Sequence, residues 1–233
     1  MKSFFLSGFL LLGTAAFAAP AAVPAPFRAG EVMTYDIKQG FIKVGQATLT
    51  FPGEAQYEGR RLFLIVFRAD GFNFYDEEKI YLDPDTFFPS VVLRDLNIFG
   101  AKEKIREDYL QGAKKIYMHK FAWGKQTEQV IAVDNPVDNI YGFIYRYRRG
   151  GSFRTGEDLD IVLPTQKLKI GIVRPERINA AGRKAASLYM ESKPDKYKIW
   201  FSIDSRHIPL RIDGAVGIAN TVMMIADYSA TQN

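Results

Sequence analysis

Apolar and polar residues alternate along most of this chain. Met33, Tyr35 and Ile37 are each separated by a polar residue, the period-two pattern of a strand with one buried face. Runs with strand character recur to the end of the chain. They predict strands at 31–38, 41–51, 62–67, 79–82, 91–98, 102–110, 114–121, 126–133, 159–163, 168–173, 185–191, 197–203, 208–212 and 218–228.

Two local features refine this pattern. Within 41–51 the apolar positions change phase at Gly45, which predicts a β-bulge at that glycine. Gln111-Gly112-Ala113 separates two alternating runs and predicts a hairpin.

One segment has helical spacing instead. Asp134-Asn135-Pro136 is typical of a helix start, and Gly150-Gly151 of a helix end. The apolar residues between them recur every three or four positions: Val137, Ile140, Tyr141, Ile144 and Tyr145. We therefore expect one amphipathic helix at about 136–149.

More than ten short strands and one helix indicate an all-β, mainly antiparallel fold. A sheet of this size must curl, close or split. Curling around the helix would bury its apolar stripe. We expect a single domain, 27–233, built as one large curved sheet or incomplete β-barrel wrapped around the helix.

The N-terminus has the pattern of an export signal. Lys2 precedes an apolar run, 4–17, and Ala16-Phe17-Ala18 fits a signal peptidase site. The alternative is an uncleaved membrane anchor, but a run of about 14 residues is shorter than the ~20 needed to span a bilayer. We predict a signal peptide at 1–18, a Pro/Ala-rich tether at 19–26, and a soluble periplasmic protein without a transmembrane span after cleavage.

Composition removes several kinds of chemistry. The 233 residues include no Cys and 2 His. Disulfides, Cys-ligated metals, a Cys nucleophile and lipid attachment at a Cys are therefore excluded. We predict no cofactor and no metal site. The net charge of +5 is mild, and with the exported location it argues against a nucleic-acid partner.

The densest acidic groups are Asp76-Glu77-Glu78 and Glu107-Asp108. Paired carboxylates can perform acid–base catalysis if they converge in a cleft. Strand neighbours point to opposite faces, however, and nearby Lys and Arg favour a solvated surface. His119 and His207 lack a partner at a recognisable motif spacing, so we predict no catalytic residue.

The helix carries the most distinctive combination of side chains. Forked arginine donors suit phosphate or carboxylate, and tyrosine can stack on sugars. The candidate ligand-binding residues are Tyr141, Tyr145, Arg146, Arg148 and Arg149. The alternative is a structural helix, buried on its Tyr/Ile stripe, with arginines favoured near its C-terminus by the helix dipole.

Two apolar groups are expected mainly in the core. One is the strand 216–225, which could instead line a ligand cavity. The other is a set of phenylalanines that could instead form an apolar groove: Phe72, Phe74, Phe87, Phe88 and Phe99.

Several segments together resemble a family of exported bacterial proteins that carry the domain of unknown function DUF3108. The matching segments are Phe27 to Glu31 with Tyr35, Gly40 to Gly45, Tyr81 to Thr86 with Pro89, Asn139 to Arg148, and Ile199 to Ser202 with Arg206 and Ile208 to Ile212. This chain departs from the family pattern at Asn139 and Gly142, where Asp and Ser are usual. The resemblance implies a mainly β protein of the cell envelope and assigns no activity.

These observations favour a non-enzymatic protein that binds an amphipathic or anionic envelope component, such as a lipid, lipopolysaccharide or a peptidoglycan fragment. Two alternatives remain open. One is a hydrolase of envelope polysaccharide or peptidoglycan that uses the carboxylates or His119. The other is a structural partner in an envelope protein complex, acting through an exposed sheet edge.

Overall fold

The computed structural model describes residues 25–216 and 221–230. The predicted signal peptide, 1–18, and most of the tether, 19–26, lie outside these residues, as do residues 217–220 of the last predicted strand. Within the described part, every predicted strand corresponds to an observed one. The strands are β1 (Glu31–Gln39), β2 (Ile42–Tyr57), β3 (Arg60–Gly71), β4 (Phe74–Leu82), β5 (Pro89–Ile98), β6 (Ala101–Leu110), β7 (Lys115–Ala122), β8 (Lys125–Ala132), β9 (Asp158–Leu163), β10 (Gln166–Ala180), β11 (Arg183–Lys193), β12 (Lys198–Ser202), β13 (Pro209–Asp213) and β14 (Thr221–Ala230).

All of these strands belong to one 14-stranded antiparallel sheet, as the alternation predicted. The order is β8-β7-β6-β5-β4-β3-β2-β1-β14-β13-β12-β11-β10-β9. Two meanders, β1 to β8 and β9 to β14, are thus joined where β1 pairs with β14. The sheet is open, because β8 and β9 remain separate edges.

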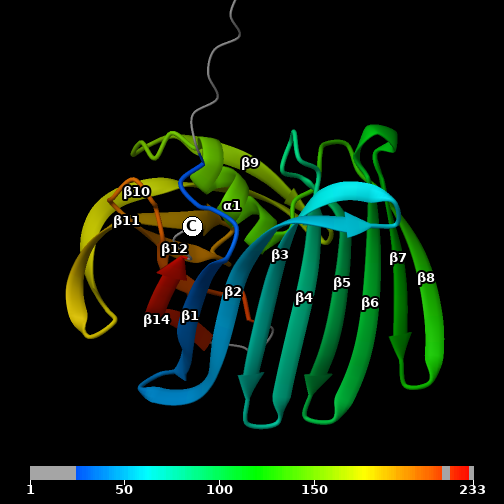
Figure 1. Ribbon diagram of the computed structural model, residues 1–233, viewed down its shortest axis with the longest axis horizontal. Helices are drawn as coiled ribbons and strands as arrows, with labels where there is room; N and C mark the ends of the chain where they lie inside the picture. Colours follow the sequence, from blue (N-terminus) through cyan, green and yellow to red (C-terminus); the bar gives the residue numbers. More distant parts are fainter. Residues whose placement is uncertain (1–24, 217–220, 231–233) are drawn as a thin grey trace, which may run out of the picture.

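The second meander curls strongly, while β3 to β8 form a flatter row (Figure 1). The amide of Ala181, after β10, donates to the carbonyl of Ile225 in β14 at 3.1 Å, so the curl brings non-neighbouring strands together. Register shifts on both sides of β1 mark bulges that help to bend the sheet. One of them leaves Val44 unpaired beside Gly45, close to the predicted phase change.

The helix α1 (Ile140–Gly150) lies in the hollow between the two meanders (Figure 1). It begins four residues after the predicted Pro136. Residues before it run extended because they bond elsewhere: Gln111, in the short 3-10 turn η1 (Gln111–Ala113), bonds both backbone groups of Val137, and the amide of Asp138 donates to Val162. The side chain of Asn139 caps the helix instead, by accepting from the amides of Tyr141 and Gly142.

The core fills the space between the inner sheet face and α1. Met33, Tyr35 and Ile37 have no exposed surface, which confirms the alternation that predicted β1. Aromatic rings dominate the contact with the helix, and Phe67 of β3 stacks on Tyr141 with ring centroids 4.1 Å apart. Eight of the eleven residues of α1 are buried, so the helix is covered on more than one side.

The expected phenylalanine cluster divides. Phe74 and Phe87 are in the core, but Phe72 and Phe99 are 82% and 71% exposed, so the core assignment was wrong for these two. Both lie at turns between strands, where no second layer covers them. No helix within 25–216 and 221–230 has the length and apolar character needed to cross a bilayer.

Candidate functional site

The five helix residues predicted to bind a ligand differ in burial: Tyr141, Tyr145 and Arg148 are buried, Arg146 is half-buried and Arg149 is exposed. Tyr141 and Tyr145 have no exposed surface. The hydroxyl of Tyr141 donates to the carbonyl of Ala215 at 3.1 Å, and the ring of Tyr145 packs edge-on against Phe27 at 4.9 Å. These tyrosines therefore hold the helix in place in this conformation.

Arg148 is paired inside the molecule. Its two terminal nitrogens lie 2.7 and 2.8 Å from the two carboxylate oxygens of Glu31, and neither side chain is exposed. Its Nε donates to the carbonyl of Arg206 at 3.1 Å. The pair connects the end of α1 to the start of β1, although Arg148 and Glu31 are 117 residues apart in the sequence.

The other two arginines also contact their own chain. Arg146 bonds Asp138 at 2.6 and 3.1 Å and lies over the ring of Phe88. Arg149 is exposed, and donates to the carbonyls of Pro84 and Asp85. The ligand-binding role of these five residues thus stays a prediction, and their visible contacts are structural.

A different cluster of charged residues lies on the inner face of the sheet. Asp76 and Glu78 are 2% and 6% exposed, whereas Glu77 between them points outward. Glu107 of β6 also faces inward, and Asp108 outward. The expectation of a solvated surface was therefore wrong for the three inward carboxylates, because alternation carries them to the covered face.

These carboxylates line or adjoin a cleft of about 240 Å³ between the two meanders, which we call the inner cleft. One wall comes from β4 to β6, and the N-terminus of α1 closes one end. The opposite wall comes from the turn between β9 and β10 and from the segments around β12. The lining residues are Glu78, Val92, Arg94, Ile105, Glu107, Tyr109, Asn139, Ile140, Leu163, Pro164, Thr165, Gln166, Lys196, Tyr197 and Ala215.

Hydrogen bonds connect the charged groups of the cleft. Arg94 bonds both oxygens of Asp76, at 2.8 and 2.5 Å, and its Nε lies 3.3 Å from Glu78. Asn139 donates to the other oxygen of Glu78 at 2.9 Å. The hydroxyl of Tyr109 donates to Glu107. Asn139 therefore caps the helix with one side-chain atom and holds a cleft carboxylate with another.

The inner cleft is lined by two acidic and two basic residues, and the buried Asp76 adds a third carboxylate beside it. Asp76, Glu78 and Glu107 share Arg94 as their nearby guanidinium, and Lys196 is the other basic residue of the lining. Burial raises the pKa of Glu78 to about 7, against the opposing attraction of Arg94. Burial also raises the pKa of Glu107, although the bond from Tyr109 opposes the shift. Near neutral pH the site can therefore change its charge.

This arrangement presents hydrogen-bond acceptors in a partly dry site. A carboxylate there accepts from hydroxyl, amide or ammonium groups, and it binds them more strongly when ionised. Within the described ranges no three His, Asp or Glu side chains are grouped so that they could hold a metal ion.

Sequence reasoning missed the inner cleft because the predicted strand 79–82 was too short. The observed β4 begins at Phe74, so Asp76 and Glu78 continue the inward phase of Phe74 and Ile80. The sequence did contain a signal for this site: Asp76 and Glu78 stand at every second position between Phe74 and Ile80, which indicates that all four face the same side of a strand.

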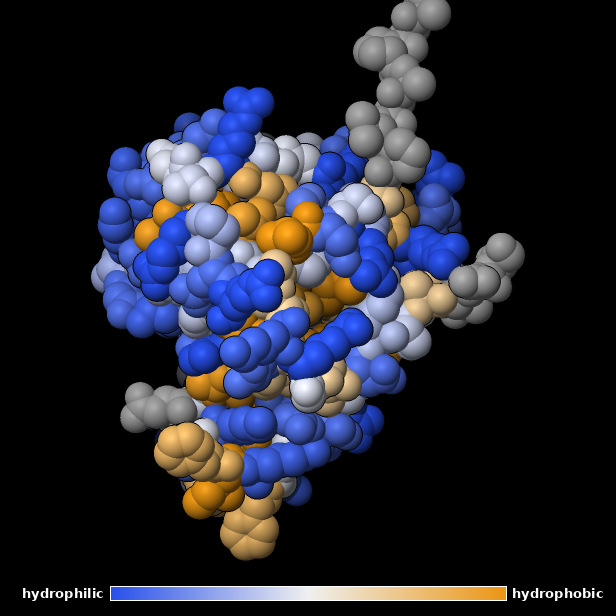
Figure 2. Space-filling view, turned by 90° about the vertical axis from the view of Figure 1, so that its left-hand side faces the viewer, coloured by the Kyte–Doolittle hydropathy of each residue, from blue (hydrophilic) through white to orange (hydrophobic). Residues whose placement is uncertain are grey.

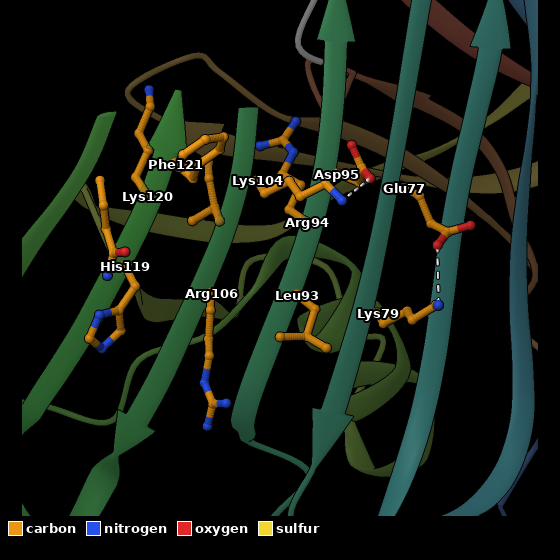
Figure 3. A pocket seen from close by; sticks show the side chains of 12 residues that line it. Glu77, Lys79, Leu93, Arg94, Asp95, Lys104, Arg106, His119, Lys120 and Phe121 are labelled. Atoms are coloured by element: carbon orange, nitrogen blue, oxygen red, sulfur yellow. Dashed lines mark ion pairs between the residues drawn. The ribbon is translucent and has the colours of Figure 1, made fainter. Parts of the chain in front are cut away.

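The two histidines do not join this site. His119 faces outward from β7, 3.3 Å from Glu128, and His207 stacks on Phe153 at 3.6 Å. His119 lines a shallow groove of about 390 Å³ on the outer face, together with Arg106 of β6 (Figure 3). The basic groups of this groove have acidic partners, as in the pairs Glu77 with Lys79 and Asp95 with Lys104 (Figure 3). The groove is thus largely charge-compensated, unlike the inner cleft.

Comparisons with known proteins find similarity to proteins of unknown function. The family model described as a protein of unknown function, DUF3108, matches residues 34–227. A comparison with curated proteins gave no match. A solved structure, the β-barrel-like protein of domain of unknown function DUF1849 from Brucella abortus, matches with a TM-score of 0.48 and 8% identity, over 88% of this chain and 99% of that one.

Proposed function

Because this chain belongs to the DUF3108 family, whose function is unknown, we propose a function from the inner cleft itself. The protein is a non-enzymatic, soluble periplasmic component of the cell envelope. It binds a hydroxyl- or amine-bearing envelope molecule, such as a peptidoglycan fragment, in the inner cleft. The predicted signal peptide and the family resemblance support the envelope location.

The observation that carries this proposal is the excess of buried carboxylate beside a cleft. Burying a charge is costly unless it is paired, and here Asp76, Glu78 and Glu107 share Arg94. Ionisable groups with shifted pKa values in a cleft are typical of functional sites. A ligand with several donors would complete the pairing.

The packing around the helix bears on which envelope molecule is favoured. Phe27, Phe51, Phe67, Tyr141 and Tyr145 fill the space between α1 and the inner face of the first meander. An acyl chain would need to displace these rings. The inner cleft is lined by both polar and apolar residues, and more of its surface is polar than apolar. This favours a glycan or peptide ligand over the lipid-carrier version of the prediction.

Native mass spectrometry tests the proposal. The protein is incubated with soluble peptidoglycan fragments, beside Glu78→Gln/Glu107→Gln and the outward-facing control Glu77→Gln/Asp108→Asn. We expect an adduct on the wild type and on the control, and at least tenfold less on the inner variant. No adduct, or equal adducts on all three proteins, would refute binding in the inner cleft.

A hydrolase is the second candidate, because the structure brings together the carboxylates that such an enzyme would need. Glu78 is partly protonated near pH 7, and Asp76 beside it is paired with Arg94. A carboxyl with a raised pKa beside a second carboxyl paired with an arginine can serve in acid–base catalysis. Turnover of labelled peptidoglycan that disappears in Glu78→Gln and persists in Glu77→Gln would favour this candidate over pure binding.

A further inference from the structure

Four hairpin turns of the first meander lie at one end of the molecule, the lower end in Figure 1. They connect β1 to β2, β3 to β4, β5 to β6 and β7 to β8. Each turn carries one aromatic residue: Phe41, Phe72, Phe99 and Trp123. We call these residues the aromatic tips. Their exposed fractions are 105%, 82%, 71% and 78%, and no other large hydrophobic residue among those described is as exposed.

Other apolar side chains extend the same end. Ile42 follows Phe41 and is 69% exposed, and Phe121 near the last tip is 52% exposed. Hydrophobic side chains project from the lower end of the molecule in the space-filling view (Figure 2). The exposure is therefore a property of this end of the sheet and not of one isolated turn.

Turn geometry does not explain the aromatic residues. Phe99 and Trp123 have φ values of +50° and +55°, and each precedes a glycine that also has positive φ. Two-residue turns with positive φ at both positions favour Asn, Asp or Gly at the first, because a bulky side chain is strained there. Aromatic residues at these two positions cost stability and gain no packing.

Basic residues accompany the aromatic tips. Within three residues of a tip the chain has five lysines and one aspartate, a net charge of 5 − 1 = +4: Lys38, Lys43, Lys102, Lys120 and Lys125 against Asp70. Lys43 and Lys120 also contact acidic neighbours, whereas Lys102 and Lys125 are exposed. This end combines apolar and cationic character.

The opposite end of the same strands provides an internal contrast. Its turns contain Glu58-Gly59, Asp83 to Phe88 and Gln111 to Ala113. The aromatic residues of these turns are covered by other parts of the protein: Phe87 is 3% exposed, and Phe88 is half-buried under Arg146. Within one sheet, exposed aromatic turns are thus confined to one end.

We infer that the aromatic tips form a docking surface for an anionic lipid bilayer. Aromatic side chains favour the interface between headgroups and acyl chains, and nearby lysines attract acidic headgroups. Successive tips are separated by two strands, or roughly 10 Å, so four of them extend about 30 Å along the membrane surface. This inference rests on the proposed envelope location, and it does not depend on occupancy of the inner cleft.

Vesicle flotation tests the inference. The purified protein is mixed with vesicles of phosphatidylethanolamine and phosphatidylglycerol, or of phosphatidylcholine alone. The test variant is Phe41→Ser/Phe72→Ser/Phe99→Ser/Trp123→Ser. The control is Val130→Ser/Ile203→Ser, which removes exposed apolar residues away from the aromatic tips. All proteins share one N-terminus, so differences between them come from the substitutions.

We expect the wild type and the control to float with the acidic vesicles and to bind neutral vesicles at least tenfold more weakly. The tip variant should bind acidic vesicles at least tenfold more weakly than the wild type, with an unchanged circular dichroism spectrum. Absence of wild-type binding, or undiminished binding by the tip variant, would overturn the inference. A wild-type dimer that the tip variant converts to monomer, without vesicle binding, would instead assign the surface to a second copy of this chain. Peptidoglycan binding in the inner cleft should be equal in all three proteins, which separates this result from the proposed function.

Discussion

Charged side chains inside this molecule are arranged in pairs, and one of these pairs links the helix to the sheet. Arginine guanidinium groups bond carboxylates in the pairs Arg94 with Asp76, Arg146 with Asp138 and Arg148 with Glu31. Two of the three arginines belong to α1. Because an unpaired buried charge is strongly unfavourable, the pair of Arg148 with Glu31 fixes the position of the helix end against β1.

The pair of Arg148 with Glu31 gives the clearest stability prediction. Arg148→Met leaves Glu31 buried without its guanidinium, so we expect the free energy of unfolding to fall by about 3–5 kcal/mol. Urea unfolding measures this loss. Arg154→Met, at an exposed arginine, should change it by less than about 0.5 kcal/mol. The double variant Glu31→Gln/Arg148→Met should recover part of the loss, and equal stability of Arg148→Met and wild type would contradict this role.

Glu78 should make stability depend on pH. Its pKa is about 7 in the folded protein, against 4.5 as its ordinary value. The folded state therefore holds an extra proton between these values, so the stabilisation is complete below about pH 4.5 and is lost as the pH rises through 7.

Relative to Glu78→Gln, the wild type should lose about 3 kcal/mol of unfolding free energy between about pH 4 and pH 8. Urea unfolding of both proteins across this range gives the difference, in which contributions from other groups largely cancel. Parallel pH profiles would show that Glu78 is not perturbed.

At the scale of elements, the start of α1 couples the helix to the inner cleft. Asn139 accepts from the amide of Tyr141 at 2.9 Å and donates to Glu78 at 2.9 Å. A helix that began at Pro136, as the sequence suggested, would lack this connection. The position of the cap thus decides which side chain reaches the cleft.

Asn139→Ala should lower the free energy of unfolding by about 1–2 kcal/mol, because it removes the cap. Asn139→Asp keeps an acceptor for the helix amides but places a second carboxylate against Glu78. Its cost should therefore be small at pH 6 and larger at pH 8, when Glu78 is ionised. Urea unfolding at the two pH values separates these effects. If Asn139→Asp lowered the free energy of unfolding equally at both pH values, contact between residue 139 and Glu78 would be ruled out.

Strand identity was readable from alternation, whereas strand length was not. The strand predicted to end at Val173 continues as β10 to Ala180, through Pro175. Proline is tolerated there because β9 pairs with β10 only up to Gly171, which leaves the rest of β10 as an edge on that side. Local sequence does not show which strands are neighbours. For the same reason the strand predicted at 79–82 was shorter than the observed β4, and the inward orientation of Asp76 and Glu78 was missed.

In the whole molecule, one sheet produces the two surfaces for which we propose functions, the inner cleft and the aromatic tips. The pairing of β1 with β14 joins the meanders, and their curvature creates the inner cleft from β4 to β6 on one side and the turn after β9 on the other. The all-β class, the single sheet and its helix followed from pattern and strand number. The inner cleft did not, because its walls come from segments that only the completed curl brings together.

Sheet pairing also explains the aromatic tips. Antiparallel order places alternate turns at the same end, so Phe41, Phe72, Phe99 and Trp123 align although they are 24 to 31 residues apart in the chain. From the sequence we expected Phe72 and Phe99 in the core, because hydrophobicity alone does not distinguish a buried strand position from an exposed turn.

Calorimetric titration with a soluble peptidoglycan fragment at several pH values tests whether the carboxylates of the inner cleft bind a donor-bearing envelope molecule. We predict that binding by the wild type tightens at least tenfold from about pH 5.5 to pH 8, as Glu78 ionises, and that Glu78→Gln binds weakly with little pH dependence. Affinity that does not change with pH, or the same pH profile in Glu78→Gln, would show that Glu78 does not bind the ligand.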